Sequence, residues 1–157
     1  MAVGKVTKYN QLESIIFSAS YRAWDHADAG SVMFMLAKET YTPLATHTTV
    51  ANIGTAGVHY ITTGSDGEPI AAASRTLDAS TTPGTTYFKS ANADFGSNKT
   101  ISAKYLIAIH PVTANVFAST AKLLWYVDLN DATTASVVQS VASDFIVNMP
   151  VYWWKTT

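Results

Sequence analysis

The sequence contains no cysteine, which excludes disulfide bonds, thiolate catalysis and any metal site that depends on a cysteine ligand. Charge is scarce as well. Asp, Glu, Lys and Arg make up 13% of the 157 residues, against roughly 25% in an ordinary globular chain. The net charge is −1, and the basic residues are dispersed along the chain. Because phosphate binding needs clustered Lys and Arg, we expect no nucleic-acid partner.

Long apolar runs are also missing. No run approaches the ~20 residues that a membrane-spanning helix needs, and the opening Met-Ala-Val-Gly-Lys-Val lacks the apolar core of a signal peptide. We therefore expect a soluble protein without membrane contact. The chain is instead 48% hydrophobic and rich in Thr, Ser and Ala. A surface so poor in charge favours association with other protein surfaces, although a compact monomer with a Thr-rich exterior is the alternative.

An amphipathic helix is predicted near the N-terminus. Apolar residues recur at helical spacing on one face: Leu12, Ile15, Ile16, Ala19 and Ala23. Asn10, followed three residues later by Glu13, has the form of a capping box. The pattern therefore predicts a helix over 10–24, preceded by an N-terminal arm over 1–9.

From residue 31 the pattern changes to short strands separated by turn residues. Residues 31–38 are apolar on both faces, with Val32, Phe34 and Leu36 on one and Met33, Met35 and Ala37 on the other. Residues 100–110 are predicted as one strand, with Tyr105, Ile107 and Ile109 on a common face. A later strand is predicted to place Leu123, Trp125, Val127 and Leu129 together.

Further extended segments are predicted over 47–53, 57–62, 70–78, 85–89 and 144–151, with a turn at 64–67. Short strands at such spacing indicate an antiparallel β-sandwich, jelly-roll or immunoglobulin-like, with one N-terminal helix. No linker, internal repeat or charged tail interrupts the chain. We therefore predict a single domain over 1–157, with the sandwich occupying 31–154.

No combination of residues matches an established catalytic or metal-binding motif. The chain has no nucleotide-binding glycine loop and no nucleophile elbow. Asp25, His26 and Asp28 offer oxygen and imidazole ligands at no known ligand spacing, so we interpret them as a polar turn. Sequence leaves open a carboxylate pair assembled in space, as in glycosidases. We expect no catalytic residue, no cofactor and no metal.

Three adjacent aromatic residues stand near the C-terminus. Because strand side chains alternate between faces, their rings cannot all enter one core. Either one ring completes the sandwich while its neighbour lies outside, or at least one is an interface anchor, a role in which Trp and Tyr are enriched. The candidate partner contacts are the apolar residues of the arm and of this aromatic end: Val3, Val6, Tyr9, Tyr152, Trp153 and Trp154.

The order of several segments resembles a widespread group of small virion proteins of tailed phages, encoded among the head genes. The resemblance covers nearly the whole chain in short motifs: Lys8-Tyr9-Asn10 before a helix, a strand entering Tyr41-Thr42-Pro43, and then the segments 101–110, 124–129 and 142–147. It implies a structural role without an active site.

The first role that the resemblance implies is capsid decoration. Such a cement protein binds across neighbouring subunits of the major capsid protein and stabilises the head. It is made in the host cytoplasm and carried on the capsid exterior. The threefold positions of a capsid lattice favour a homotrimer. Two other interpretations remain open: a connector or tail protein of the same virion, and a carbohydrate-binding or glycan-cleaving β-sandwich that uses its aromatic residues as sugar platforms.

Overall fold

The computed structural model describes residues 5–16, 32–79, 86–130, 137–149 and 154–155. This part of the chain is mainly β, with antiparallel strand pairs, one short helix α1 (Leu12–Ile16) and a 3-10 turn η1 (Val50–Ile53). The strands are β1 (Thr7–Lys8), β2 (Met33–Ala37), β3 (Ile70–Ala71), β4 (Thr76–Ala79), β5 (Thr86–Lys89), β6 (Ala93–Asp94), β7 (Lys99–Ala103), β8 (Tyr105–His110), β9 (Lys122–Asp128), β10 (Val138–Ser143), β11 (Ile146–Val147) and β12 (Trp154–Lys155). The predicted fold class, mainly β and antiparallel with an N-terminal helix, is confirmed. Jelly-roll or immunoglobulin-like connectivity stays a prediction.

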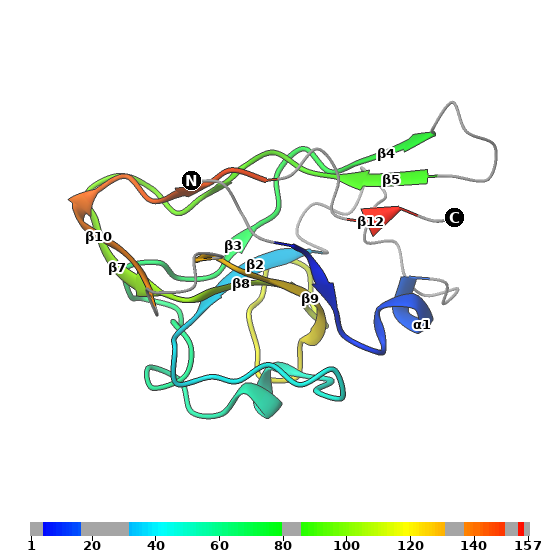
Figure 1. Cartoon of the computed structure of the whole chain (residues 1–157), viewed down its shortest axis with the longest axis horizontal. Coiled ribbons are helices and arrows are strands. Elements are labelled where there is room, and N and C mark those ends of the chain that lie inside the picture. Colours follow the sequence, from blue (N-terminus) through cyan, green and yellow to red (C-terminus); the bar gives the residue numbers. More distant parts are fainter. Residues whose placement is uncertain (1–4, 17–31, 80–85, 131–136, 150–153, 156–157) are drawn as a thin grey trace.

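A five-stranded sheet lies at the centre of the molecule, in the order β1-β9-β8-β2-β3 (Figure 1). Its middle strands pair from Met33 opposite Ile109 to Ala37 opposite Tyr105. Every residue of β2 is buried, because both faces of the sheet are covered. The sequence had indicated a central strand here, because residues 31–38 are apolar on both faces. The predicted faces of β2 and β8 are confirmed.

The second layer is a long antiparallel ribbon. One side consists of β5, β6 and β7 and the other of β12, β11 and β10; β4 adds a third strand beside β5. Phe88 pairs with Trp154, Ala93 with Val147 and Ile101 with Ser140, so the three short pairings follow nearly one register. The ribbon extends along one side of the central sheet (Figure 1).

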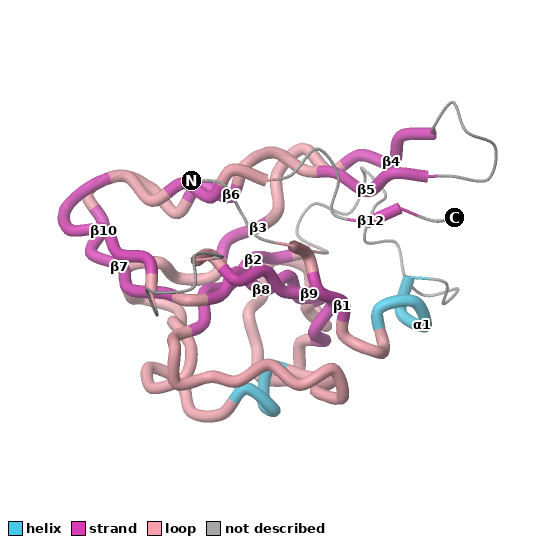
Figure 2. Tube along the Cα trace, viewed as in Figure 1, coloured by secondary structure: helices cyan, strands magenta, loops and turns pink. Residues whose placement is uncertain are grey.

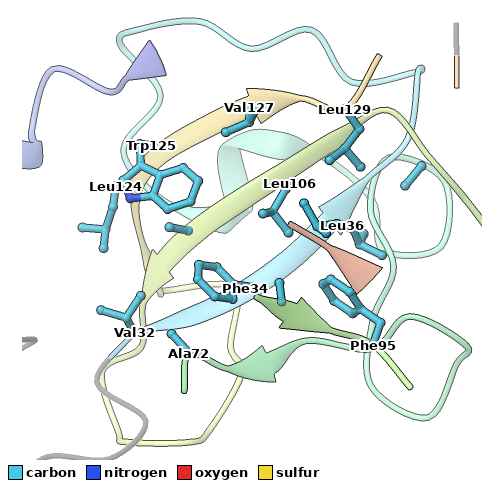
Figure 3. Close-up of a cluster of buried hydrophobic side chains, with 14 of the residues drawn as sticks. Val32, Phe34, Leu36, Ala72, Phe95, Leu106, Leu124, Trp125, Val127 and Leu129 are labelled. Atoms are coloured by element: carbon cyan, nitrogen blue, oxygen red, sulfur yellow. The ribbon is translucent and has the colours of Figure 1, made fainter. Parts of the chain in front are cut away.

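Two hydrophobic cores cover the two faces of the central sheet. The first core lies between the sheet and the ribbon (Figure 3). Its buried members include, from the sheet, Val32, Phe34, Leu36, Leu106, Trp125 and Val127, and from the ribbon, Phe88, Phe95, Ile101, Phe145 and Val147. Long loops lie on the opposite side of the central sheet (Figure 2). Side chains from these loops and from the sheet form the second core. Its members include Tyr9, Met35, Tyr41, Val50, Ile53, Tyr60, Ile107 and Leu123.

The segment 100–110 is two strands rather than the predicted one. The backbone turns at Lys104, whose N–H donates to the carbonyl of Ala37 and whose carbonyl accepts from the N–H of Leu129, both at 2.8 Å. Residues before this point pair in the ribbon and residues after it pair in the central sheet. Apolar residues recur at every second position through the bend, so the sequence pattern does not reveal that Ile101 and Ala103 enter the first core whereas Tyr105 and Ile107 enter the second.

A β-bulge in β9 overturns a second prediction. The register shifts so that Trp125 lies opposite Ala108 while Leu123 lies opposite Ile109, which leaves Leu124 as the extra residue. Leu123 therefore packs in the second core, whereas Leu124 and Trp125 both pack in the first. The predicted common face of Leu123 and Trp125 is wrong, because a bulge reverses the alternation on one side of it.

Two segments predicted as strands are loops. In 47–53, Val50 and Ile53 reach the second core from η1, at the three-residue spacing of a 3-10 helix. In 57–62, turns carry Tyr60 inward, and it forms only isolated bridges. Thr- and Val-rich composition suggested strands, but these residues form a cover that is bound to other segments by single hydrogen bonds, such as those from the N–H of Val50 to the carbonyl of Ala121 and from the N–H of Ile61 to the carbonyl of Leu36. The predicted turn at 64–67 is confirmed.

The predicted helix is confirmed over α1, and the remainder of 10–24 beyond Ile16 lies outside the described residues. The predicted capping box does not form. The N–H of Asn10 donates to the carbonyl of Ala45 at 2.9 Å, and the carboxylate of Glu13 pairs with Lys8 at 2.9 Å. Tertiary contacts therefore replace the local cap.

Candidate functional site

The structure separates the predicted partner contacts. Tyr9 is 1% exposed and belongs to the second core, so the chain itself covers its ring, and its role as a partner contact stays a prediction. Val6 is half-buried and packs against the first core. The backbone of Trp154 pairs with Phe88 in β12. The remaining predicted contacts, Val3, Tyr152 and Trp153, lie outside the described residues.

Tyr9 begins a chain of hydrogen bonds that leads outward from the second core. Its hydroxyl lies 2.9 Å from the hydroxyl of Tyr41, and the hydroxyl of Tyr41 lies 3.0 Å from Nδ1 of His47. Tyr9 and Tyr41 are buried, whereas His47 is partly exposed. The rings of Tyr105 and Tyr126 pack against this pair, with centroid distances of 5.4 to 6.0 Å.

Both phenols are held in the protonated form. Burial, and then the hydrogen bond to Tyr41, raises the pKa of Tyr9 far above its ordinary value. Burial also raises the pKa of Tyr41, to about 12, although the hydrogen bond from Tyr9 opposes the shift. At neutral pH these groups therefore act as hydrogen-bond donors and acceptors rather than as bases. Sequence reasoning missed the pair, because only the fold brings Tyr9 next to Tyr41.

The other polar residues singled out from sequence make local bonds. Nδ1 of His59 accepts the backbone N–H of Thr55 at 3.0 Å. Oδ1 of Asp128 accepts the N–H of Asn130 at 3.0 Å, which forms the turn expected after this strand. The segment around His26 lies outside the described residues. In the part of the chain that the structure describes, no three His, Asp or Glu side chains gather as metal ligands, and no helix is long and apolar enough to cross a membrane.

A shallow cavity of about 300 Å³ opens between the loop 57–66 and β7. Lys38 and Asp66 lie on its wall, but both already have partners. The ammonium of Lys38 donates to the carbonyl of Gly57. Asp66 accepts the N–H of Thr100 at 2.9 Å and pairs with Lys99 at 3.3 Å. The hydrogen bond from Thr100, reinforced by Lys99, lowers the pKa of Asp66.

The chemistry of this cavity is therefore that of hydroxyl groups. Ser65 and Thr62 line it, and the described lining includes no histidine that could act as their general base. Asp66 stays ionised and accepts the N–H of Thr100, and this hydrogen bond links the loop to β7. The cavity therefore offers hydroxyl groups beside two charged groups, Lys38 and Asp66, that already hold backbone partners.

The outer face of the ribbon is a set of exposed residues that carries little charge. Most of its members alternate with buried neighbours, whereas Val141 stands at the register shift between Ser140 and Ser143, where Ala142 is exposed as well. The members are Asn92, Asp94, Thr100, Ser102, Gln139, Val141, Ile146 and Asn148. We call this set the outer ribbon face. Val141 is 76% exposed and Ile146 is 38% exposed. Asp94 is its one charged member, and Oδ1 of Asp94 accepts the N–H of Gly96 at 2.8 Å.

A second group of exposed apolar residues lies in the long loops that cover the second core. It consists of Leu44, Val58, Val112 and Val116, and we call it the loop-side group. Val112, at 73%, is as exposed as Val141. Within the described residues, the exposed large apolar side chains therefore fall into two groups on different elements, and paired substitutions can distinguish them.

The fold and these surfaces describe an antiparallel β protein whose exposed strand face is nearly uncharged. Comparison of the chain with models of protein families, with curated proteins and with solved structures finds no match.

Proposed function

We propose that this chain is a non-enzymatic structural protein of a tailed-phage virion, and first of all a capsid decoration protein. In this role it binds across neighbouring subunits of the major capsid protein and stabilises the head. The order of its sequence segments is one support. The observation that carries the proposal is the outer ribbon face, where Val141 and Ile146 are exposed among neutral polar side chains.

An uncharged β-face of this kind is suited to a protein partner. Burying apolar area contributes roughly 25 cal/mol per Å² before the costs of association are subtracted. Thr, Ser, Gln and Asn side chains can complete hydrogen bonds across an interface without the desolvation of full charges. Asp94 is already bonded to Gly96, so few charges have to be matched by the partner. Attachment by this face should therefore change little with moderate salt.

The polar groups of the described residues support a non-enzymatic role. Asp66 and His59 each hold backbone N–H groups in place, and Lys38 holds a backbone carbonyl. The alternative of a connector or tail protein uses the same surface in another place on the virion. The carbohydrate alternative depends on Tyr152, Trp153 and Trp154, because the exposed large apolar side chains within the described residues are all aliphatic.

Co-pelleting with capsids tests the proposal. Purified protein is mixed with bare expanded capsids of the phage that encodes it, and in parallel with the unassembled capsid subunit. We expect the protein to pellet with the expanded lattice and to bind the isolated subunit far more weakly. A surface that straddles subunits finds its whole footprint only after assembly, and a specific interface needs about 1,000 Å². Failure of the unmodified protein to pellet would remove the decoration role.

Two matched variants locate the contact. Val141→Asp places a carboxylate on the outer ribbon face, and Val112→Asp places one on the loop-side group at nearly equal exposure. We expect Val141→Asp to weaken capsid binding about tenfold or more, as charge at an interface centre does, and Val112→Asp to leave it unchanged. Equal urea midpoints show that both variants are folded. The reverse result would assign the contact to the loop-side group, and a loss with Trp153→Ala and Trp154→Ala would assign it to the aromatic end.

A further inference from the structure

Three segments distant in sequence meet at the β9 bulge. The N–H of Tyr9 donates to the carbonyl of Leu124 at 3.1 Å, and the side-chain amide of Gln11 donates to the carbonyl of Leu123 at 2.9 Å. The N–H of Leu123 donates to the carbonyl of Thr48 at 3.0 Å. The arm that carries β1 and α1 and the loop 41–49 are thus both bound to the bulge. The chain from Tyr9 through Tyr41 to His47 joins these two segments to each other.

The number of available protons fixes which group donates in each of the two hydrogen bonds, Tyr9 to Tyr41 and Tyr41 to His47. Among the described residues, the buried hydroxyl of Tyr9 has one partner, the hydroxyl of Tyr41. A buried O–H without an acceptor is costly, so Tyr9 donates to Tyr41. The proton of Tyr41 then has Nδ1 of His47 as its acceptor. The closed arrangement therefore needs a neutral His47 whose proton is on Nε2.

A second proton on His47 conflicts with this arrangement. Imidazolium has N–H on both ring nitrogens and no acceptor. Three hydrogens, those on the two phenol oxygens and on Nδ1 of His47, would then share the two contacts from Tyr9 to Tyr41 and from Tyr41 to His47. Each contact can use only one hydrogen, so one phenol O–H would have no acceptor in the core. His47 is partly exposed, so a proton can reach it from solvent without global unfolding.

Among the described residues, Glu39 stands two residues before Tyr41, and no carboxylate forms an ion pair with His47. The arm carries Lys5 together with Lys8 and Glu13, and the last two form an ion pair with each other at 2.9 Å. On β9, Lys122 lies across an isolated bridge from Thr49 and adds positive charge. The rings packed against Tyr9 and Tyr41 are those of Tyr105 and Tyr126, which are neutral. The closed form is therefore favoured while His47 is neutral and weakens as the pH falls.

We propose that Tyr9, Tyr41 and His47 form an acid-sensitive latch, which holds the N-terminal arm against the β9 bulge and loosens it when His47 takes up a proton. Histidine is the side chain whose charge ordinarily changes between about pH 5 and pH 8. The latch does not depend on whether the protein decorates a capsid.

Hydrogen exchange of the full chain at about pH 7.5 and about pH 5.5 tests the latch. Protection factors, corrected for the intrinsic rate at each pH, are compared for the amides of Tyr9 and Asn10 and for Ile107 in the central strand β8. We expect arm protection to fall about tenfold or more relative to Ile107 at the lower pH. His47→Gln, which removes the titratable ring, should abolish this fall, and His110→Gln should preserve it. A fall that persists in His47→Gln, or no fall in the unmodified protein, would overturn the proposal.

A measurement on the unmodified protein covers the case in which His47→Gln does not fold. Nitrogen-15 chemical shifts of the imidazole ring distinguish the two neutral tautomers. We expect an unprotonated Nδ1 and a protonated Nε2 in His47 at neutral pH. A proton on Nδ1 would mean that His47 already donates to Tyr41, and the latch would then have no acid sensitivity.

Discussion

Replacing Gly67 with alanine should destabilise the protein more than the same replacement at Gly64, although the two glycines have nearly the same backbone conformation. Their φ angles are +80° and +78°, and they stand in the same turn. A side chain at positive φ costs roughly 1–2 kcal/mol, and restriction of the unfolded chain returns part of that cost. Both contributions are common to the two variants, so they cancel in the difference.

The difference in lost unfolding free energy between Gly67→Ala and Gly64→Ala therefore measures packing between the two layers. A Cβ at Gly67 would lie 3.1 Å from Cδ1 of Ile101 in β7 and 3.1 Å from Cδ1 of Leu36 in β2. Both neighbours are buried in the first core, at 2% and 0% exposure, and have little room to move. Overpacking of this kind costs about 1–3 kcal/mol. A Cβ at Gly64 would meet no described atom within 4 Å.

Urea unfolding of both variants and the unmodified protein is the assay. We expect Gly67→Ala to lose about 1–3 kcal/mol more unfolding free energy than Gly64→Ala, with similar denaturant slopes. In thermal melting, each 1 kcal/mol corresponds to roughly 2–4 °C for a chain of this size. Equal losses in the two variants would refute the inference that Gly67 is the point of close contact between the turn, β2 and β7.

Three further predictions concern single contacts and assembly. Tyr41→Phe should destabilise the protein by about 1–3 kcal/mol, because it leaves the O–H of Tyr9 without an acceptor, whereas Tyr9→Phe should cost about 1 kcal/mol or less; chemical denaturation measures both. Asp66→Asn should weaken the link to Thr100 at neutral pH. Because the pKa of Asp66 is lowered in the folded state, its contribution is present above pH ~4 and is lost as the pH falls through the folded value, so the gap between variant and unmodified protein should close in acid. The free protein should sediment as a homo-oligomer, with a trimer expected, and a monomer at micromolar concentration would contradict this.

The faces of the central strands were predictable from sequence, because a strand covered on both sides has apolar residues at every position. Val32 and Met33 were assigned to opposite faces, and they lie in the first and second core. The position of the bulge was not predictable. Leu123 and Leu124 are both apolar, so either could face either core, and only pairing with Ala108 and Ile109 decides between them.

The candidate site was less predictable than the fold. The sequence places Tyr9 in the N-terminal arm. Its contacts with β9 and with the loop after β2 were not predictable, because both segments are distant from Tyr9 in sequence. The outer ribbon face was not predictable from sequence for a related reason. Val141 belongs to β10, for which no strand was predicted, since its Ser and Ala neighbours give a weak signal. Val141 and Thr100 become neighbours only through the ribbon register.

The ribbon has a consequence for the kinetics of folding. β7 leads through Lys104 into β8, and β9 leads toward β10, so the ribbon and the pair β8–β9 are the two halves of one long hairpin closed by the loop 111–121. Such a hairpin can pair progressively from its loop, and each new pair closes only a short additional length of chain, which limits the entropy lost at each step. We expect the ends, β5 and β12, to pair last. Substitutions near the loop 111–121 should therefore slow folding, whereas substitutions at Phe88 should chiefly speed unfolding.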